Sequence, residues 1–410
     1  MAKLAVNGGT PVREGKSFPR WPIYGEAEKE ALMRVLADEN WGINSVEIDA
    51  FEKEFAAYQQ CRYAVTMCNG SVTLRNAILA CGVESGDEVI VPPYTFLATV
   101  TGVLEANCVP VFADIDPETF NLDPAAIERA ITPRTKVIIP VHIGGNPAEM
   151  DSIMAVARKH GLKVIEDAAH AVGAEYKGRR VGSIGDIGSF SFQSSKNLCC
   201  GEGGAIVTND EDLFIRCWSV HNCGRDLTGA WYEHNRLGGN YRLGAFAAAL
   251  LRAQMKKLEG EIALRDRNAR RLIEKLSDVP GVNPLKVPET TTRHAWHLFV
   301  MRYDKTAFDG LDRAVWLKAL QAEGLPLFAG YDTPHYRHKF MLNKNFYSFD
   351  GWRKSNPDLD YGKIHLPCAE KAAYEQSCWL PQNVMLGSDR DIDDVADAFR
   401  KVYENRSELK

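Results

Sequence analysis

The sequence predicts an α/β protein built around a mostly parallel sheet with helices on both faces. Between about residues 60 and 210, short runs rich in β-branched residues alternate with helical stretches. This alternation is typical of parallel strands that are connected by helices. A long helical region at about residues 243–278 follows, and beyond Val279-Pro280-Gly281 the pattern predicts a smaller α+β lobe.

The individual elements can be assigned in chain order. Residues 1–25 are rich in Gly and Pro and predict an extended arm, which precedes a first helix near residues 26–38. Strands are expected at 87–91, 109–112, 136–141, 163–166, 189–192 and 205–208, and helices at 73–81, 125–131 and 150–160. The second lobe is expected to hold a strand at 296–302 and helices at 313–323 and 390–403. We therefore expect an arm (1–25), a large domain (26–260) and a small domain (261–410).

Composition narrows the classes of partner. The 410 residues are 45% hydrophobic and 25% charged, with a net charge of -5 and no run of Lys and Arg. Nucleic-acid binding is therefore not expected, and small molecules are the expected partners. The ten cysteines are scattered without a Cys-x-x-Cys pair, which argues against a disulfide framework or a zinc ribbon. Because no signal peptide or membrane span is visible, we expect a cytoplasmic protein.

Lys196 is the most informative residue of the sequence. It follows a β-like run and precedes the glycine-rich segment Gly201-Glu202-Gly203-Gly204. A lysine amine attacks a carbonyl only when it is deprotonated, and a half-buried, electropositive pocket lowers its pKa enough for that. Most lysines are solvated surface charges, so this interpretation needs partners elsewhere in the chain.

Three further motifs supply such partners near the ends of predicted strands, where ligands bind in parallel sheets. The turn Asn69-Gly70-Ser71 feeds a helix and suits an anion, although such turns are first of all caps. Phe96 could stack on a flat ring, and Asp167 could pair with a protonated ring nitrogen; core packing and an N-cap are the commoner roles. A phosphate cradle, an aromatic platform, a carboxylate and a carbonyl-trapping lysine together match the needs of pyridoxal 5'-phosphate.

Over nearly its whole length the chain resembles the DegT/DnrJ/StrS family of pyridoxal-phosphate-dependent aminotransferases. The resemblance implies fold type I, with a large domain around a mostly parallel seven-stranded sheet and a smaller C-terminal α+β domain. It rests on Asn69-Gly70-Ser71, Pro92-Pro93-Tyr94-Thr95-Phe96, Pro140-Val141-His142, Glu166-Asp167-Ala168-Ala169-His170, the segment 191–204 and Gly239-Asn240-Tyr241-Arg242-Leu243.

The resemblance also implies how the phosphate is held. The turn at Gly70 carries the backbone amides of Ser71 and Val72, which match the family's phosphate donors, and Ser191 matches a hydroxyl donor. Asn240 matches a position that reaches across a dimer interface to the phosphate of the partner's site. A homodimer with shared active sites is therefore expected.

For the ring of the cofactor, the resemblance assigns four residues. Phe96 corresponds to the stacking residue, Asp167 to the partner of the pyridinium nitrogen, and His170 to a neighbour of the ring hydroxyl. Lys196 corresponds to the lysine that forms the Schiff base and moves the proton in transamination. Lys196 and Asp167 are thus the expected catalytic residues.

Within the family, the segments on both sides of Lys196 are similar to the cyclitol branch, which includes glutamine:scyllo-inosose aminotransferases. We therefore expect transfer of an amino group from glutamine or glutamate to a keto-cyclitol or keto-sugar. Cys199-Cys200 and the bulk of Val72 depart from the family pattern, which puts the pocket shape in doubt. The alternatives are a nucleotide-linked ketosugar aminotransferase and an aromatising enzyme like 3-amino-5-hydroxybenzoate synthase. Lys196 argues against the family's dehydratases, which carry His there, and a non-enzymatic cofactor sensor has little support.

Polar and aromatic residues near the predicted cleft are candidates for binding the acceptor, although each is more often structural. These candidates are Trp41, His142, His221, Arg225, His335 and Tyr336. The pairs His294/His297 and His335/His338 have a spacing that metal ligands can use. No cysteine or carboxylate completes either set, so no metal is expected.

Overall fold

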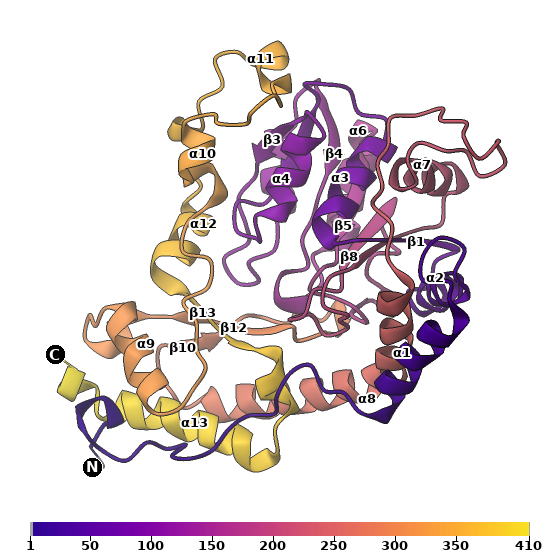
Figure 1. Ribbon diagram of the computed structural model, residues 1–410. Helices are drawn as coiled ribbons and strands as arrows, with labels where there is room; N and C mark the ends of the chain where they lie inside the picture. The colour runs from indigo at the N-terminus through magenta and orange to yellow at the C-terminus, as the bar shows by residue number, and fades with distance from the viewer. Residues whose placement is uncertain (1–2, 410) are drawn as a thin grey trace.

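The large sheet confirms the predicted α/β class. Figure 1 shows the computed structural model, which describes residues 3–409 apart from the side chains of residues 354 and 355. Seven strands run in the order β1-β9-β8-β5-β4-β2-β3. All neighbouring pairs are parallel except those of β9, which is antiparallel to β1 and β8. The strands are β1 (Tyr63–Met67), β2 (Glu88–Val91), β3 (Val109–Phe112), β4 (Thr135–Ile138), β5 (Lys163–Asp167), β8 (Ile187–Ser191) and β9 (Gly204–Thr208).

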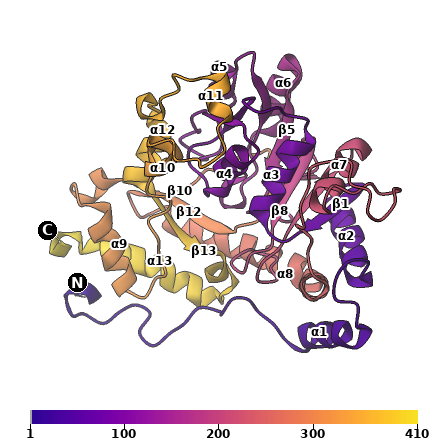
Figure 2. The ribbon, with the colours of Figure 1, turned by 45° about the horizontal axis from the view of Figure 1, so that its top comes forward.

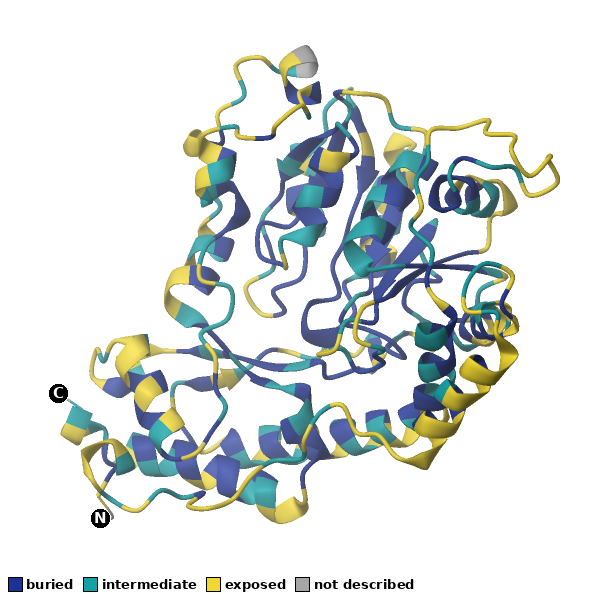
Figure 3. Cartoon of the chain, viewed as in Figure 1, coloured by how far each residue is buried: buried dark blue, intermediate teal, exposed yellow. Residues whose placement is uncertain are grey.

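Helices cover both faces of this sheet because strand residues alternate between two apolar clusters. On one face, Val89 and Val91 of β2 pack with α3 (Gly70–Ala80), α4 (Ala98–Glu105) and α7 (Glu211–His221). On the other face, Ile90 packs in a cluster shared by α2 (Val46–Tyr58), α5 (Pro124–Ala130), α6 (Met150–His160) and α8 (Ala245–Leu276). Figure 3 shows the strands as the most deeply buried part of this region.

A second, antiparallel sheet of β10 (Val282–Pro284), β12 (Leu298–Tyr303) and β13 (Ser377–Pro381) has its own apolar cluster. This cluster includes residues of α9 (Arg313–Ala322) and α13 (Asp389–Glu404). The remaining elements are α1 (Glu26–Asp38), β6 (Glu175–Tyr176), β7 (Arg179–Arg180), β11 (Thr291–Arg293), α10 (Lys339–Leu342), α11 (Gly351–Ser355) and α12 (Pro367–Lys371). Within residues 3–409 no helix combines the length and apolar character needed to cross a bilayer.

The long helix α8 connects the two cores, as Figure 2 shows. Leu251 and Leu258 belong to the cluster under the large sheet, whereas Leu272 and Leu276 belong to that of the second sheet. The predicted helix at 243–278 is therefore confirmed. The division into domains at residues 25/26 and 260/261 stays a prediction.

The helix α2 is an element that the sequence patterns did not predict. Its residues are rich in charge, and only Phe51 and Phe55, four positions apart, are large and fully buried. Both rings pack edge-on against Phe192 of the segment that follows β8, and Phe55 also contacts Phe190. The helix α2 thus covers the face of β8 on which Phe190 lies, and β8 leads to Lys196.

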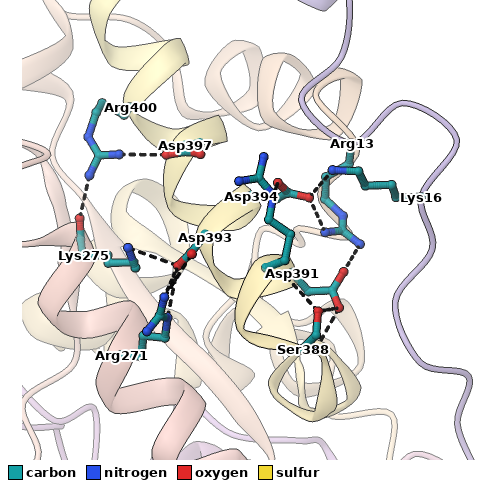
Figure 4. A network of polar contacts seen from close by, with 11 residues as sticks. Arg13, Lys16, Arg271, Lys275, Ser388, Asp391, Asp393, Asp394, Asp397 and Arg400 are labelled. Carbon is teal, nitrogen blue, oxygen red and sulfur yellow. Dashed lines mark hydrogen bonds and ion pairs between the residues drawn. The ribbon is translucent and has the colours of Figure 1, made fainter.

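The N-terminal arm is fixed to the C-terminal helix α13 by buried ion pairs, drawn in Figure 4. The fully buried guanidinium of Arg13 contacts Asp391 at 2.8 Å and Asp394 at 3.2 Å, and Lys16 adds a 2.7 Å contact to Asp394. Removing one partner of a buried pair leaves an uncompensated charge, at a cost of about 3–5 kcal/mol. The arm is therefore held at a defined place although most of it is exposed.

Candidate active site

Lys196 lies in a tight turn directly after β8, at the carboxyl end of the parallel part of the sheet. Its backbone N–H donates to the carbonyl of Gln193 at 2.8 Å, and the N–H of Ser194 donates to Gly201 O at 2.8 Å. The arm reaches this turn as well, since the indole Nε1 of Trp21 donates to the carbonyl of Ser194 at 3.0 Å. The position of Lys196 is therefore fixed by hydrogen bonds within the turn and by the hydrogen bond from Trp21 of the arm.

Burial increases the fraction of Lys196 whose amine is neutral and can attack a carbonyl. Desolvation lowers its pKa from 10.5 to about 8, and the nearby carboxylate of Asp167 offsets part of this effect. A neutral amine is the nucleophilic form, so an appreciable fraction is reactive near neutral pH.

Asp167 is a buried carboxylate at the end of β5. Its Oδ2 accepts from Thr99 at 2.8 Å, and its Oδ1 accepts from the backbone N–H of Ala169 at 3.2 Å. Burial raises its pKa, while these hydrogen bonds and the charge of Lys196 favour the ionised form. Among the described residues no cation forms a salt bridge with it, so the carboxylate is held ready for a positively charged partner.

The predicted phosphate turn meets the strand that leads to the lysine. A Cβ atom on Gly70 would lie 2.7 Å from the Cβ of Ser191, so only glycine lets the start of α3 approach β8 this closely. The N–H of Val72 donates to the capping side chain of Asn69 at 2.9 Å. The N–H of Ser71 has no partner within residues 3–409, which leaves it available at the helix N-terminus.

The other two predicted ring contacts differ in exposure. The side chain of Phe96 is 59% exposed, which leaves a large aromatic face open to a ligand. His170 is buried, its Nδ1 accepts from Gly144 N–H at 3.4 Å, and its ring packs on His297 with 4.4 Å between centroids. Burial lowers the pKa of His170 well below its usual value, and the charge of Lys196 contributes. His170 is therefore neutral.

Three residues of this region were not predicted as site residues: Thr99, Asn197 and His297. Thr99 and His297 are brought in by tertiary contacts to Asp167 and His170. His297 was considered only as a metal ligand. Asn197 follows the lysine in the chain and is buried, so its position beside Lys196 was the one available signal.

Three acceptor candidates are engaged inside the protein. Both ring nitrogens of His142 are hydrogen bonded, to Glu166 and to the N–H of Ala148, each at 3.0 Å. The hydroxyl of Tyr336 donates to Glu370 at 2.8 Å, and the residue is fully buried. His335 donates from Nε2 to the carbonyl of Thr95 at 2.7 Å and thereby fixes the segment that precedes Phe96. These contacts hold all three side chains within the protein, and their role in binding the acceptor stays a prediction.

Two of the other acceptor candidates line a separate cavity of about 230 Å³. His221 and Arg225 line it together with Glu52, Asn222 and Arg242, but Lys196 and Asp167 do not. Burial lowers the pKa of His221 to about 4. Trp41 is 53% exposed, and its ring contacts Phe246 at the start of α8.

Asn240 lies between α7 and α8, in residues 222–244, most of which are exposed. Its backbone forms a bridge with Asn222, while its side chain is exposed. Among residues 3–409, no hydrogen bond joins Asn240 to the residues around Lys196.

The histidines whose spacing could suit a metal make other contacts in the protein. His294 accepts the N–H of Trp296 at 2.8 Å and stacks on its ring. Among the described residues, no three side chains of His, Cys, Asp or Glu form a group suited to a metal ion.

The lowered pKa of Lys196 predicts a specific pH dependence. Because the neutral fraction grows as pH rises through the pKa, we expect half-maximal labelling of cofactor-free protein by an amine-reactive reagent near pH 8. Peptide mass spectrometry measures this site by site. Exposed Lys177 is the internal control, since Asp151 raises its pKa and it should need a higher pH. Equal profiles for the two lysines would contradict the prediction.

Known proteins match this chain over nearly its whole length. A family model described as the DegT/DnrJ/EryC1/StrS aminotransferase family matches residues 23–400. A protein of Streptomyces kanamyceticus, named putative L-glutamine:3-amino-2,3-dideoxy-scyllo-inosose aminotransferase, is 38% identical over 99% of this chain and 98% of its own length. A protein of Streptoalloteichus tenebrarius, named L-glutamine:2-deoxy-scyllo-inosose aminotransferase, is 36% identical over 99% of each chain. The crystal structure of 3-amino-5-hydroxybenzoic acid synthase has a TM-score of 0.86 at 33% identity, covering 95% of this chain and 99% of that one.

Proposed function

Because the chain belongs to the DegT/DnrJ/EryC1/StrS aminotransferase family, we propose that it uses pyridoxal phosphate to transfer an amino group from glutamine to a keto-cyclitol. The observation that carries the substrate class is the similarity to two glutamine:inosose aminotransferases, at 38% and 36% identity across nearly the full chain. Glutamate is the related donor that the proposal also allows.

The residues around Lys196 fit this cofactor. Asp167 is a buried carboxylate without a salt bridge among the described residues, which suits a protonated ring nitrogen. The close approach of Gly70 to Ser191, together with the N–H of Ser71, suits a phosphate at a helix N-terminus. The exposed ring of Phe96 suits stacking on a planar heterocycle.

When bound, the cofactor supplies an aldehyde for the donor amine and a ring that accepts the electron pair of the substrate carbon. Lys196 provides an amine whose lowered pKa lets Nζ take a proton from that carbon and return it elsewhere. Asp167 keeps negative charge fixed in a dry site, and Thr99 holds its Oδ2 at 2.8 Å. His170, neutral and buried, can donate from Nε2 to an oxygen on the ring.

A second candidate is an aromatising reaction like that of 3-amino-5-hydroxybenzoate synthase. It is favoured by the TM-score of 0.86 to the synthase structure over 95% of this chain. Such a reaction would use the same lysine and carboxylate. The nucleotide-linked ketosugar aminotransferase differs from the proposed aminotransferase only in the acceptor.

A panel of donors and acceptors tests the proposal. The purified protein should absorb in the visible, borohydride should abolish that band, and mass spectrometry should find the tag on Lys196. Glutamine with scyllo-inosose should then give an amino-cyclitol faster than any nucleotide ketosugar gives its amine. A colourless protein unable to bind pyridoxal phosphate would overturn the cofactor. A preference for nucleotide ketosugars would overturn the acceptor class alone.

We further propose a homodimer in which Asn240 contributes to the partner's phosphate site. The exposure of its side chain, away from the hydrogen bonds around Lys196, supports this arrangement. Asn240→Ala should weaken cofactor affinity on the order of 10-fold, because one hydrogen bond to a charged group contributes about 1.5–3 kcal/mol.

Mixing two variant chains, at a cofactor concentration that saturates the wild type but leaves the Asn240→Ala protein largely unloaded, separates a shared site from a local one. In a dimer of Asn240→Ala and Lys196→Ala chains, one site regains both residues, so activity should return on mixing. The control mixes Lys196→Ala with Asp167→Asn chains. Those two residues belong to one chain's site, so that pair should stay inactive. No recovery with the Asn240 variant, or unchanged cofactor affinity in it, would contradict the shared site.

A further inference from the structure

Residues 193–201 form the turn that carries Lys196, called the lysine turn below. The side chain of Asn197 links this turn to the segment that precedes β12. Its Nδ2 donates to the carbonyl of Ala295 at 2.7 Å, and its Oδ1 lies 3.2 Å from Nδ1 of His297. Asn197 and His297 are 4% and 5% exposed. The residue next to Lys196 is therefore anchored to a part of the chain 100 positions away.

These two contacts determine where the proton of His297 sits. A backbone carbonyl only accepts, so Ala295 must face the NH₂ group of Asn197, which turns the amide oxygen toward His297. That oxygen also only accepts, so Nδ1 of His297 must carry the proton. Burial and the charge of Lys196 lower the pKa of His297 well below its usual value, so the ring is neutral and Nε2 keeps its lone pair.

His170 has the opposite arrangement. Its Nδ1 accepts from Gly144 N–H, so its proton lies on Nε2. The two rings pack at 4.4 Å between centroids with a tilt of 37°. Both rings are close enough to Lys196 for its charge to affect them. Two neutral imidazoles with different tautomers thus lie together beside the amine.

The segment that carries His297 is itself rigid. The N–H of Ala295 donates to Gly145 O at 3.0 Å, and the indole of Trp296 donates to Asp266 of α8 at 2.8 Å. A Cβ on Gly145 would lie 2.8 Å from the carbonyl of His170 and 2.9 Å from the N–H of Trp296. Because Gly145 also has a φ of +95°, only glycine is compatible with this packing.

We propose that Asn197 and His297 are positioning residues for Lys196 and His170. The amide of Asn197 fixes the proton of His297 on Nδ1, and the His297 ring holds His170 as a neutral Nε2–H donor next to the lysine. This inference rests on the proposed function, since it concerns the same site. Misplacing reacting groups by about 1 Å can cost on the order of 100-fold in rate, so a positioning role is measurable.

The tautomers can be observed directly in the full-length, cofactor-loaded protein. With ¹⁵N-labelled histidine, long-range ¹H–¹⁵N spectra distinguish Nδ1–H, Nε2–H and doubly protonated rings. The His297→Gln and His170→Gln variants assign the two signals. We expect His297 as the neutral Nδ1–H form and His170 as the neutral Nε2–H form between pH 6 and 9. The opposite tautomer or a protonated ring at His297 would overturn the inference, whatever substrate the enzyme uses.

A matched pair of variants tests the link to the lysine. In Asn197→Asp, the new carboxylate cannot donate to Ala295, and its negative charge raises the pKa of Lys196. The pH for half-maximal labelling of Lys196 should therefore rise by about one unit or more. The control is Asn268→Asp, because Asn268 is also fully buried and donates to the carbonyls of Met385 and Gly387 at 2.9 and 2.8 Å.

The two asparagine variants should lose comparable stability, but only Asn197→Asp should shift the labelling of Lys196. Turnover separates the roles further. His297→Gln should lower kcat on the order of 10-fold or more while the KM of the donor changes little, because misalignment affects the reacting groups rather than binding. A labelling profile that is the same in both Asn variants would refute the positioning role. Lack of glutamine:inosose activity in the wild type would refute only the proposed substrates.

Discussion

Replacement of Lys196 by alanine is expected to lower the rate of amino transfer on the order of 10⁴-fold, the upper range for loss of a proton-transferring side chain. The structure provides one amine of this kind, half-buried in the turn after β8, with a pKa near 8. Steady-state turnover with glutamine and a keto-cyclitol measures the loss, and the fall should appear in kcat.

The stability of the Lys196→Ala variant shows whether its loss of activity comes from catalysis or from folding. Because the pKa of Lys196 is lowered, burial of the charged amine opposes folding at neutral pH. The unfolding midpoint of cofactor-free Lys196→Ala protein should therefore equal or exceed that of the wild type. Lys177→Ala, which removes an exposed lysine, is the control and should leave turnover unchanged. Wild-type activity in the Lys196 variant would remove the lysine from the mechanism.

Replacement of Asp167 by asparagine is expected to lower kcat on the order of 10²–10³-fold, comparable to the removal of one preorganised electrostatic contact. The amide has nearly the same shape and can still accept from Thr99, so the change removes mainly the negative charge. Without that charge, a protonated ring nitrogen in the site loses its partner. The visible absorbance of the loaded protein should shift together with the rate.

The neighbouring carboxylate offers a matched control for Asp167. Glu166 is fully buried and accepts the N–H groups of Gly182, Ile184 and Gly185 at 2.6–2.7 Å. Glu166→Gln places an NH₂ group opposite some of these donors, so it should cost stability and leave the absorbance unchanged. An equal spectral change in both variants would show that Asp167 acts through folding rather than through charge.

The parts of the fold that the sequence predicted are those that local patterns determine. Buried β-branched strands, the helix at 150–160 and the long helix α8 have clear apolar periodicity, so their positions were predicted closely. The charged helix α2 has only Phe51 and Phe55 as large buried residues, which is too weak a pattern. β1 and α7 were likewise not predicted, because tertiary packing rather than local composition determines them.

The candidate site shows the same division. That Lys196 and Asp167 lie near each other could be predicted, because the ends of parallel strands meet at one edge of a sheet, and their catalytic roles stay a prediction. Thr99 and His297 could not be predicted, since their roles depend on contacts with residues 68 and 100 positions away. His142 and Tyr336 have the chemistry of substrate ligands, yet their hydrogen bonds to Glu166 and Glu370 place them within the protein.

The ion pairs between the arm and α13 determine when the first part of the arm can be fixed during synthesis of the chain. Arg13 is synthesised 378 and 381 residues before its partners Asp391 and Asp394. The ion pairs that hold the first part of the arm therefore form only after residue 394 has been synthesised, whereas Trp21 and Ile23 also contact α8. A nascent chain stalled before residue 391 would hold every residue of the lysine turn and still lack these ion pairs.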